Sequence, residues 1–186
     1  MRRLLWLTPV VFLFVIAGIG LFRARPQAEL GSPGPSFSLP TLEDPDERLS
    51  LADLRGKPAV LNFWASWCEP CRAEAAVLAR GAREHRKDIE FLGIAILDGR
   101  QSALEFIEEF EVPYGSVRDA RGIVAKRYGV TGVPETVFVD PRGNVAGSYI
   151  GAIDQATLDR LLDDLLDLEP GELLRITGRG ETRPVP

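Results

Sequence analysis

The amino-acid sequence predicts an α/β domain with a central mixed sheet that is flanked by helices. Short apolar runs, typical of buried strands, alternate with amphipathic segments of helical periodicity, and this order favours parallel strands connected through helices. Two later apolar runs are separated only by the turn at residues 141–144, which predicts an antiparallel hairpin. The chain has 186 residues, of which 45% are hydrophobic and 26% charged, so one core with appendages is expected.

The first half of the domain is expected to contain a hairpin, a helical turn, a buried strand and a helix. Residues 37–39 and 48–51 lie on either side of an acidic turn and predict an N-terminal β-hairpin. A helical turn follows at residues 51–56 and ends at a glycine. The apolar run 59–64 predicts a buried strand, and residues 70–80 predict a helix that begins beside the only two cysteines.

The second half continues this alternation. Its expected elements are a strand at 89–97, helices at 101–110 and 119–128, a hairpin at 136–140 and 145–150, and a last helix at 155–168. The helical periodicity of these segments gives two inward faces, which comprise Leu104, Ile107 and Phe110 on one helix and Leu158, Leu161, Leu162, Leu165 and Leu166 on the last.

The first 25 residues predict a membrane anchor. Residues 4–22 form a 19-residue stretch without a charge, which is long enough to span a bilayer, and arginines lie on both sides of it. No small-residue cleavage site follows, so we expect an uncleaved signal-anchor helix that holds the domain on the extracytoplasmic side. Residues 26–36 predict a linker, 37–168 the folded domain and 169–186 a mobile C-terminal tail.

The charge distribution argues against nucleic-acid binding. The formal net charge is −5, and the first 25 residues hold four of the 22 basic residues and no acidic one. The rest of the chain therefore has 18 basic and 27 acidic side chains, a net charge of −9. Nucleic-acid phosphates favour clusters of Lys and Arg, so we expect no nucleic-acid partner.

The two cysteines, Cys68 and Cys71, are three positions apart at the junction between the strand 59–64 and the following helix. Unpaired amides and the positive end of the helix dipole at this junction favour a thiolate over a thiol. Cys68 is therefore the expected nucleophile. Cys71 lies one helical turn further in, where it can form a disulfide with Cys68 and resolve a mixed disulfide.

Other roles for a cysteine pair fit less well. A zinc site would need two more Cys or His ligands, and the chain has one histidine, His85, which we expect at a solvated helix end. The strand–CxxC–helix order is instead typical of thioredoxin-like redox chemistry, in which the Cys68/Cys71 disulfide needs no further cofactor and no metal. Peroxidases of that fold carry Thr three residues before the reactive cysteine, whereas this chain has Ala65.

Two motifs, Trp67-Cys68-Glu69-Pro70-Cys71 and residues 128–136, give the chain a family resemblance. From about Phe37 to Leu168 it resembles the membrane-anchored thioredoxin-like reductases of cytochrome c maturation, the ResA, CcmG (DsbE) and TlpA group. The resemblance implies a thioredoxin-like fold with an extra strand-helix insert around residues 101–110. It also implies a cis-proline at Pro134, which would place the Val133 backbone beside Cys68, where a substrate can pair as an added strand.

The resemblance also implies a role for Glu74. This residue is three positions after Cys71, so one helical turn brings it to the same face. Plain thioredoxins carry a buried Asp six residues before the first cysteine, and this chain has Asn62 there. Glu74 would then exchange protons with Cys71. The alternative is an exposed glutamate paired with a neighbour such as Arg80.

The remaining candidate residues would form a substrate-binding surface around the disulfide. Trp67 would cover the disulfide, and Glu135 would line a groove for the substrate. The expected substrate-binding residues are Trp67, Glu69, Pro70, Val133, Pro134 and Glu135.

The implied function is that of an extracytoplasmic thiol-disulfide oxidoreductase that acts as a reductant. Its substrate would be the CxxCH disulfide of apocytochrome c, or another extracytoplasmic disulfide protein. Its electrons would come through a membrane dithiol carrier of the CcdA or DsbD type. An N-terminal anchor in the cell membrane would raise the effective concentration of these partners.

Three other functions remain open on the residues alone. A TlpA-like reductase for copper-site assembly and a disulfide-forming oxidant would both use the same cysteine pair. A copper-binding chaperone would use the two thiolates as soft metal ligands. The chain has one Met and one His, so it offers no cluster of further copper ligands.

Overall fold

The computed structural model describes residues 29–169 and 172–176. The expected anchor and the first residues of the expected linker lie outside these ranges. No helix within the described residues is long and apolar enough to span a bilayer.

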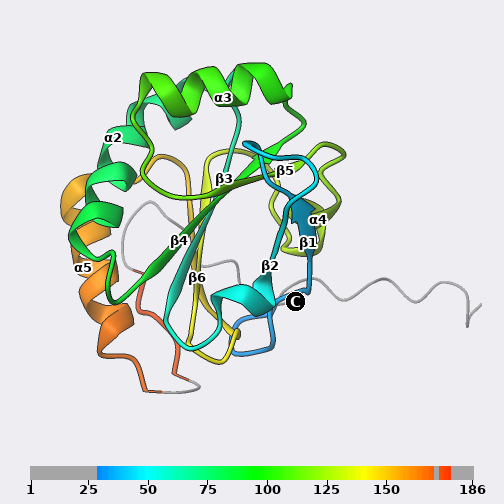
Figure 1. Cartoon of the computed structure of the whole chain (residues 1–186). Helices are drawn as coiled ribbons and strands as arrows, with labels where there is room; N and C mark the ends of the chain where they lie inside the picture. The colour runs from blue at the N-terminus through cyan, green and yellow to red at the C-terminus, as the bar shows by residue number, and fades with distance from the viewer. Residues whose placement is uncertain (1–28, 170–171, 177–186) are drawn as a thin grey trace, which may run out of the picture.

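A five-stranded sheet forms the centre of the domain (Figure 1). Its strand order is β5-β4-β3-β6-β7, with bounds Ser116–Asp119 for β5, Glu90–Ile96 for β4, Ala59–Trp64 for β3, Glu135–Val139 for β6 and Val145–Ile150 for β7. The strands β3, β4 and β5 are parallel, whereas β6 and β7 run antiparallel to their neighbours. The predicted mixed sheet is therefore confirmed.

A second, two-stranded sheet precedes the central one. Its strands are β1, Ser38–Pro40, and β2, Arg48–Ser50, and the 3-10 helix η1, Leu51–Leu54, follows directly. An isolated bridge between Thr41 and Val117 joins this hairpin to β5. The predicted N-terminal hairpin thus packs beside the outer strand of the central sheet.

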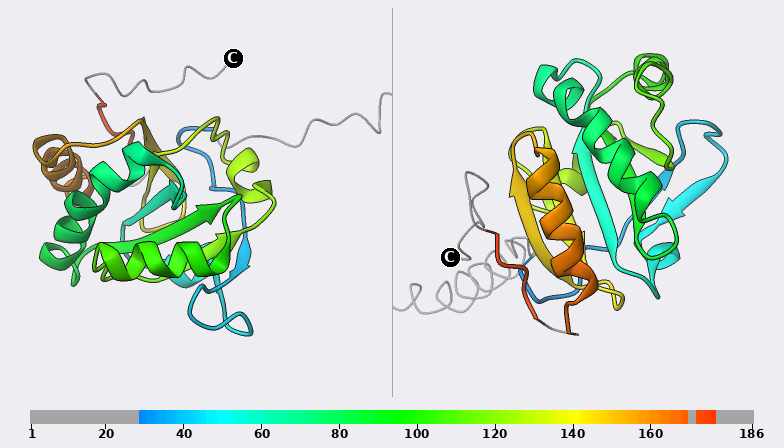
Figure 2. Two further views of the ribbon diagram at one scale, coloured as in Figure 1. Left: turned by 90° about the horizontal axis from the view of Figure 1, so that it is seen from above. Right: turned by 90° about the vertical axis from the view of Figure 1, so that its left-hand side faces the viewer.

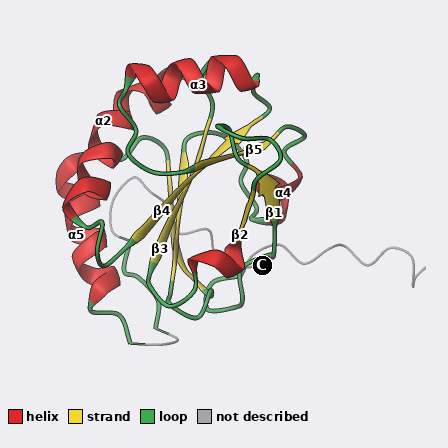
Figure 3. Cartoon of the chain, in the orientation of Figure 1, coloured by secondary structure: helices red, strands yellow, loops and turns green. Residues whose placement is uncertain are grey.

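Helices cover both faces of the central sheet (Figure 3). On one face lie α2, Glu69–Glu84, α3, Arg100–Glu109, and α5, Gln155–Leu166. The other face is covered by α4, Ile123–Arg127, together with η1 and the hairpin. Figure 2 shows α2 and α5 side by side along the sheet.

Alternating residues of β3 divide the core between the two faces, because successive strand side chains point to opposite sides. Leu61 and Phe63 pack with residues of α4 and η1, while Val60 packs with Leu78 of α2 and Leu158 of α5. A third cluster, at the end of β3, contains both cysteines and residues of α3. The two cysteines therefore lie at the end of β3, where this strand meets the helices α2 and α3.

Four details differ from the sequence prediction. The resemblance implied an extra strand with the helix 101–110, but no residue range was predicted for the strand β5, and the predicted helix 119–128 is a short helix of five residues, α4. In α3 the fully buried residues are Ala103 and Phe106, whereas the predicted inward residues, Leu104, Ile107 and Phe110, are only partly buried. In α5 the predicted inward face is correct except for Leu166, which is exposed.

Both ends of the described chain pack against the start of β7. The amide of Gly31 donates to the carbonyl of Val145, and the amide of Val145 donates to the carbonyl of Ser32. The amide of Leu174 donates to the carbonyl of Ala146, and the Leu174 side chain is buried. The expected linker and tail therefore contribute ordered segments to the domain.

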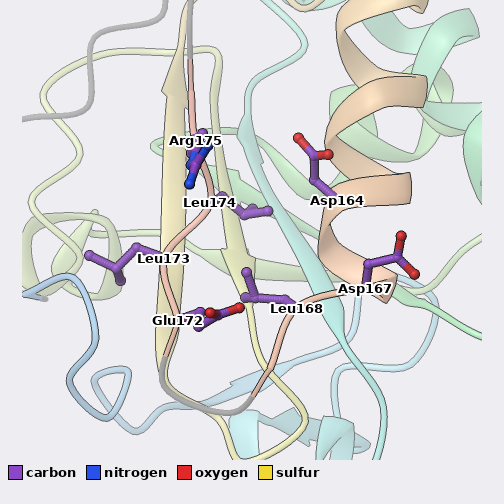
Figure 4. Close-up of a pocket in the computed structure, with 7 residues that line it drawn as sticks. All are labelled: Asp164, Asp167, Leu168, Glu172, Leu173, Leu174 and Arg175. Carbon is purple, nitrogen blue, oxygen red and sulfur yellow. The ribbon is translucent and has the colours of Figure 1, made fainter.

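The C-terminal segment borders a pocket of about 420 Å³ at the end of α5 (Figure 4). Its lining includes Asp164, Asp167 and Glu172. Within the described ranges, no group of three or more His, Cys, Asp or Glu side chains is placed to hold a metal ion. This pocket therefore carries no metal-site assignment.

Candidate active site

The two cysteines form a disulfide at the start of α2. Cys68 is the N-cap of this helix, and Cys71 lies in its first turn, with 5.3 Å between the two Cα atoms. The backbone amide of Cys71 donates to the Sγ of Cys68 at 3.2 Å. A sulfur atom at this position faces the positive end of the helix dipole, which favours a thiolate once the disulfide is reduced.

Both sulfur residues are largely covered. Cys68 is 4% exposed and Cys71 is 1% exposed, so Cys68 is the more accessible of the two. They pack in one apolar cluster with Trp64 and Phe106, whose rings stack with centroids 4.4 Å apart. Exposure therefore favours attack at Cys68 over attack at Cys71.

The loop between β3 and α2 is fixed by Asp98, a buried residue that sequence analysis did not select. Its carboxylate accepts hydrogen bonds from the Ser66 amide at 2.6 Å, the Ser66 hydroxyl at 2.9 Å and the Gly99 amide at 2.8 Å. The signal in the sequence was an Asp directly after a buried strand, but nothing local pointed to Ser66, 32 positions earlier. Asp98 thus ties the loop before Cys68 to the end of β4.

Trp67 lies on the surface directly before Cys68. Its side chain is among the exposed large apolar groups, with 62% exposure. Its indole nitrogen donates to the carbonyl of Leu97 at 3.4 Å, which directs the ring toward the segment after β4. Glu69 and Pro70, at the start of α2, are also exposed. These three residues can therefore contact a protein that approaches the disulfide.

Glu74 is buried on the inner side of α2, with 1% exposure. One carboxylate oxygen accepts from the side-chain amide of Asn62 at 2.9 Å, and the other accepts from the backbone amide of Ile153 at 3.0 Å. The alternative of an exposed glutamate paired with Arg80 is wrong, because Arg80 forms its ion pair with Glu84.

Burial shifts the titration of Glu74. Loss of solvation raises the pKa of this carboxyl from 4.5 to about 7, although the hydrogen bonds from Ile153 and Asn62 act in the opposite direction. Burial, with a smaller contribution from the Glu74 charge, also raises the pKa of Tyr114. A carboxyl that titrates near neutral pH, one helical turn from Cys71, can take up or release a proton during thiol exchange.

Pro134 follows a cis peptide bond from Val133. Val133 packs against the cluster that contains both cysteines, and the Pro134 carbonyl accepts from the Gly151 amide at 2.9 Å. Glu135 is also buried, but it pairs with Phe63 across the sheet and so belongs to the face opposite Glu74. The structure therefore brings Val133 to the disulfide and separates Glu135 from Glu74.

Comparison with known proteins identifies the family of the chain. The family model described as the AhpC/TSA family matches residues 30–148. The chain is 39% identical over 163 residues to the thiol:disulfide interchange protein DsbE of Pseudomonas fluorescens biotype C. The aligned region covers 83% of this chain and 89% of that protein. It is 34% identical over 145 residues to the thiol-disulfide oxidoreductase ResA of Oceanobacillus iheyensis, and this aligned region covers 76% of this chain and 73% of ResA.

A solved structure shares the same fold. The structure of MTB DsbF in its mixed oxidized and reduced forms matches with a TM-score of 0.64 and 38% sequence identity. The match covers 69% of this chain and 94% of the DsbF chain. The fold is thus thioredoxin-like, as the order of strand, cysteine pair and helix predicted.

Proposed function

Since this chain belongs to the AhpC/TSA family of thioredoxin-like proteins and is a thiol-disulfide oxidoreductase, we propose that it is an extracytoplasmic reductant of apocytochrome c. The substrate bond in this proposal is the disulfide of the CxxCH haem-attachment motif. The observation that carries the proposal is the buried Glu74 carboxyl, held by Asn62 one helical turn after Cys71. It gives Cys71 a proton acceptor near neutral pH, which a resolving thiol requires.

The proposed reaction moves two electrons from the Cys68/Cys71 dithiol to the substrate disulfide. The Cys68 thiolate attacks one substrate sulfur, the substrate S–S bond breaks, and the other substrate sulfur leaves as a thiolate. The Cys71 thiol then loses its proton and attacks the Sγ of Cys68. The mixed disulfide breaks, the substrate leaves with both cysteines reduced, and the domain is left with the disulfide seen in the structure.

Glu74 acts in the second step of this proposal. Its carboxylate accepts the Cys71 proton as the Cys71–Cys68 bond forms, and the proton returns when the domain is reduced again. Both Glu74 oxygens also accept hydrogen bonds, from Asn62 and Ile153, which keep the carboxyl in place through the cycle. Glu74 therefore has to titrate in the range where the exchange works.

The substrate polypeptide is proposed to bind across the Val133 backbone next to the cis-proline. The exposed residues Trp67, Glu69 and Pro70 provide the other side of this binding surface. The extended substrate would pair with Val133 as an added strand, which supplies affinity through main-chain hydrogen bonds. Glu135 lies on the other face of the sheet, so it would support the Pro134 loop without contacting the substrate.

The oxidised domain must be reduced again after each turnover. We assign this step to a membrane dithiol carrier of the CcdA or DsbD type, on the basis of the likeness to DsbE and ResA. The uncharged stretch 4–22 would anchor the domain in the cell membrane, so that the carrier and substrate meet it at high effective concentration.

The reduction potential of the Cys68/Cys71 pair tests the direction of the reaction. A value toward about −270 mV, as in thioredoxin, supports a reductant, while a value near about −120 mV, as in DsbA, would make the protein a disulfide donor. The measurement equilibrates the full chain with dithiothreitol or glutathione and quantifies the free thiols.

Substrate trapping tests the partner. The Cys71→Ser variant should accumulate a mixed disulfide with an oxidised CxxCH peptide, while Cys68→Ser should form none. Faster trapping of a copper-site assembly protein than of the CxxCH peptide would favour the TlpA-like function. Tight binding of Cu(I) by the reduced protein without peptide reduction would instead favour a copper chaperone.

A further inference from the structure

A second pocket is lined by residues of the hairpin strand β1 and of the helix α4. These two elements lie close together in Figure 1. Its volume is about 650 Å³, and four arginines contribute to its lining: Arg48, Arg118, Arg121 and Arg127. The acidic residue in this lining is Asp119, whose two carboxylate oxygens accept from the backbone amides of Ile123 and Ala125. The pocket is therefore basic, although the chain after residue 25 has a net charge of −9.

The four arginines are not neutralised by carboxylates. Among the described residues, no ion pair includes any of them. Arg118 donates from Nε to the Asp98 carbonyl at 2.9 Å, Arg127 donates to the Ser36 carbonyl at 2.6 Å, and Arg48 donates to the hydroxyl and carbonyl of Ser38. Neutral acceptors orient these three guanidinium groups but leave their charge available to an anionic partner.

The pocket is connected to the disulfide through exposed apolar side chains. Trp67 contacts the carbonyl of Leu97, and a Cβ atom at Gly122 would lie 3.6 Å from the Leu97 side chain. Gly122 precedes Ile123, which lines the pocket. Trp67, Leu97 and Ile123 are three of the five exposed large apolar residues in the part of the chain that the structure describes. We call these three residues the apolar strip.

Hydrogen bonds beneath the surface also connect the pocket to the loop that precedes Cys68. Arg118 binds the carbonyl of Asp98, and the Asp98 carboxylate holds Ser66, two positions before Cys68. One residue thus links the wall of the pocket to the loop that carries the nucleophile. The apolar strip and the arginine pocket consequently form one surface that leads away from the disulfide.

We propose that this surface binds the protein substrate of the reductase, with acidic side chains of the substrate in the arginine pocket. The inference rests on the proposed function, since it identifies which polypeptides that site prefers. The substrate's apolar residues beside the reactive cysteine lie on the apolar strip, and a nearby Asp or Glu pairs with Arg121 and Arg127. Guanidinium groups bind carboxylates with two parallel hydrogen bonds, so the pocket selects acidic over neutral segments.

The test compares two disulfide peptides that differ only in three flanking residues, Glu in one and Gln in the other. The full chain in zwitterionic detergent should reduce the acidic peptide with the lower KM and the same kcat. Two exposed ion pairs contribute enough for a KM ratio of about fivefold. The double variant Arg121→Gln/Arg127→Gln should lose this ratio, and 0.5 M salt should reduce it in the parent chain.

The matched control is Arg86→Gln combined with Lys87→Gln, which makes the same charge change at exposed positions outside the pocket. This control should keep the preference for the acidic peptide. Equal KM values for both peptides in the parent chain, or equal losses in the pocket and control variants, would overturn the proposal.

A redox-independent measurement separates this proposal from the proposed function. Peptides with Ser in place of both Cys bind without exchange, so their affinity reports docking alone. Tighter binding of the acidic Ser peptide supports docking in the arginine pocket, whether or not the disulfide peptides are reduced. A lack of reduction of both disulfide peptides would refute only the reductase function. Equal binding of the two Ser peptides would show that the proposal is wrong. If phosphatidylglycerol in the detergent then changes Trp67 fluorescence in the parent chain but not in the Arg121→Gln/Arg127→Gln variant, the pocket binds lipid instead.

Discussion

The side-chain amide of Asn62, on β3, donates a 2.9 Å hydrogen bond to the carboxyl of Glu74, on α2. Both residues are buried, and the bond connects the central strand to the helix that carries both cysteines. A buried carboxyl at this place links the protonation of the site to the stability of the fold. The first two predictions follow from this link.

Glu74 should make the oxidised protein less stable as the pH rises from about 4.5 to about 7. The folded state raises the pKa of Glu74 to about 7, so it holds this proton more tightly than the unfolded chain does. The resulting stability is fully present below the unfolded pKa and is lost as the pH rises through about 7, by about 3 kcal/mol in total. Glu74→Gln should flatten this pH dependence in urea unfolding.

The control for this prediction is Glu84→Gln. Glu84 lies on the same helix and is exposed, where it pairs with Arg80. Its substitution makes the same change of charge, so it should leave the slope between pH 4.5 and 7 unchanged. A slope that survives in Glu74→Gln would show that another group is responsible.

Asn62→Leu should raise the pKa of Glu74 further. The hydrogen bond from Asn62 lowers this pKa, so its removal leaves burial less opposed. Titration of the Glu74 side-chain carboxyl by carbon NMR measures the change. Thr136→Val removes only the 3.3 Å contact of Asn62 with the Thr136 hydroxyl and should have a smaller effect. A lower pKa in Asn62→Leu would contradict the assigned cause.

Asp98→Asn should loosen the loop that precedes Cys68. The side-chain amide of Asn has one acceptor oxygen where the carboxylate has two, so at least one of the three donors, the Ser66 amide, the Ser66 hydroxyl and the Gly99 amide, loses its partner. These donors are only part-buried, and the loss of one hydrogen bond to a charged carboxylate should lower the free energy of unfolding by about 1.5–3 kcal/mol, with faster hydrogen exchange at the Ser66 amide. Asp88→Asn, at an exposed position, is the control. Equal exchange rates in both variants would rule out this role of Asp98.

Leu174→Ala should destabilise the domain by about 2–5 kcal/mol, because it removes a buried side chain from the core beside α5. The neighbouring Leu173 is 46% exposed, so Leu173→Ala should cost at most about 0.5 kcal/mol. Thermal or urea unfolding of the two variants measures the difference. Equal stability of the two would mean that the segment 172–176 does not pack in solution.

The parts of the fold that the sequence predicted are those with a strong local signal. The run Ala59–Trp64 is apolar except for Asn62, and the cysteine pair follows at once, so both β3 and the start of α2 could be placed. The turn 141–144 placed β6 and β7. Leucine periodicity placed α5, with the exception of Leu166 near its end.

The parts that were missed depend on contacts between distant residues. The strand β5 has one aliphatic residue, Val117, and the hairpin segment beside it completes the burial of the strand. In α3 the ring of Phe106 stacks on Trp64, which turns the helix so that Phe106 and Ala103 face the core. Periodicity within a helix gives its apolar face only approximately, and the aromatic partner on β3 decides the rotation.

The candidate site likewise contains residues that local spacing predicts and residues that only distant contacts bring together. The cysteines and Glu74 follow from spacing within one helix, but the donors that hold Glu74 come from β3 and from Ile153, 79 positions away. Glu135 is next to Pro134 in sequence, yet strand alternation places it on the other face of the sheet. Adjacency in sequence, where a loop passes into a strand, is therefore a poor guide to a shared site.

The packing of both terminal segments on β7 has a consequence for how copies of the protein meet. β7 is the last strand of the sheet, and an uncovered outer strand offers free amides and carbonyls to which another chain can add. Residues 31–32 and Leu174 take up such groups at Val145 and Ala146. The ends of the domain thus occupy the start of this edge and hinder the addition of another chain there, a protection that a fragment trimmed to residues 37–168 would lack.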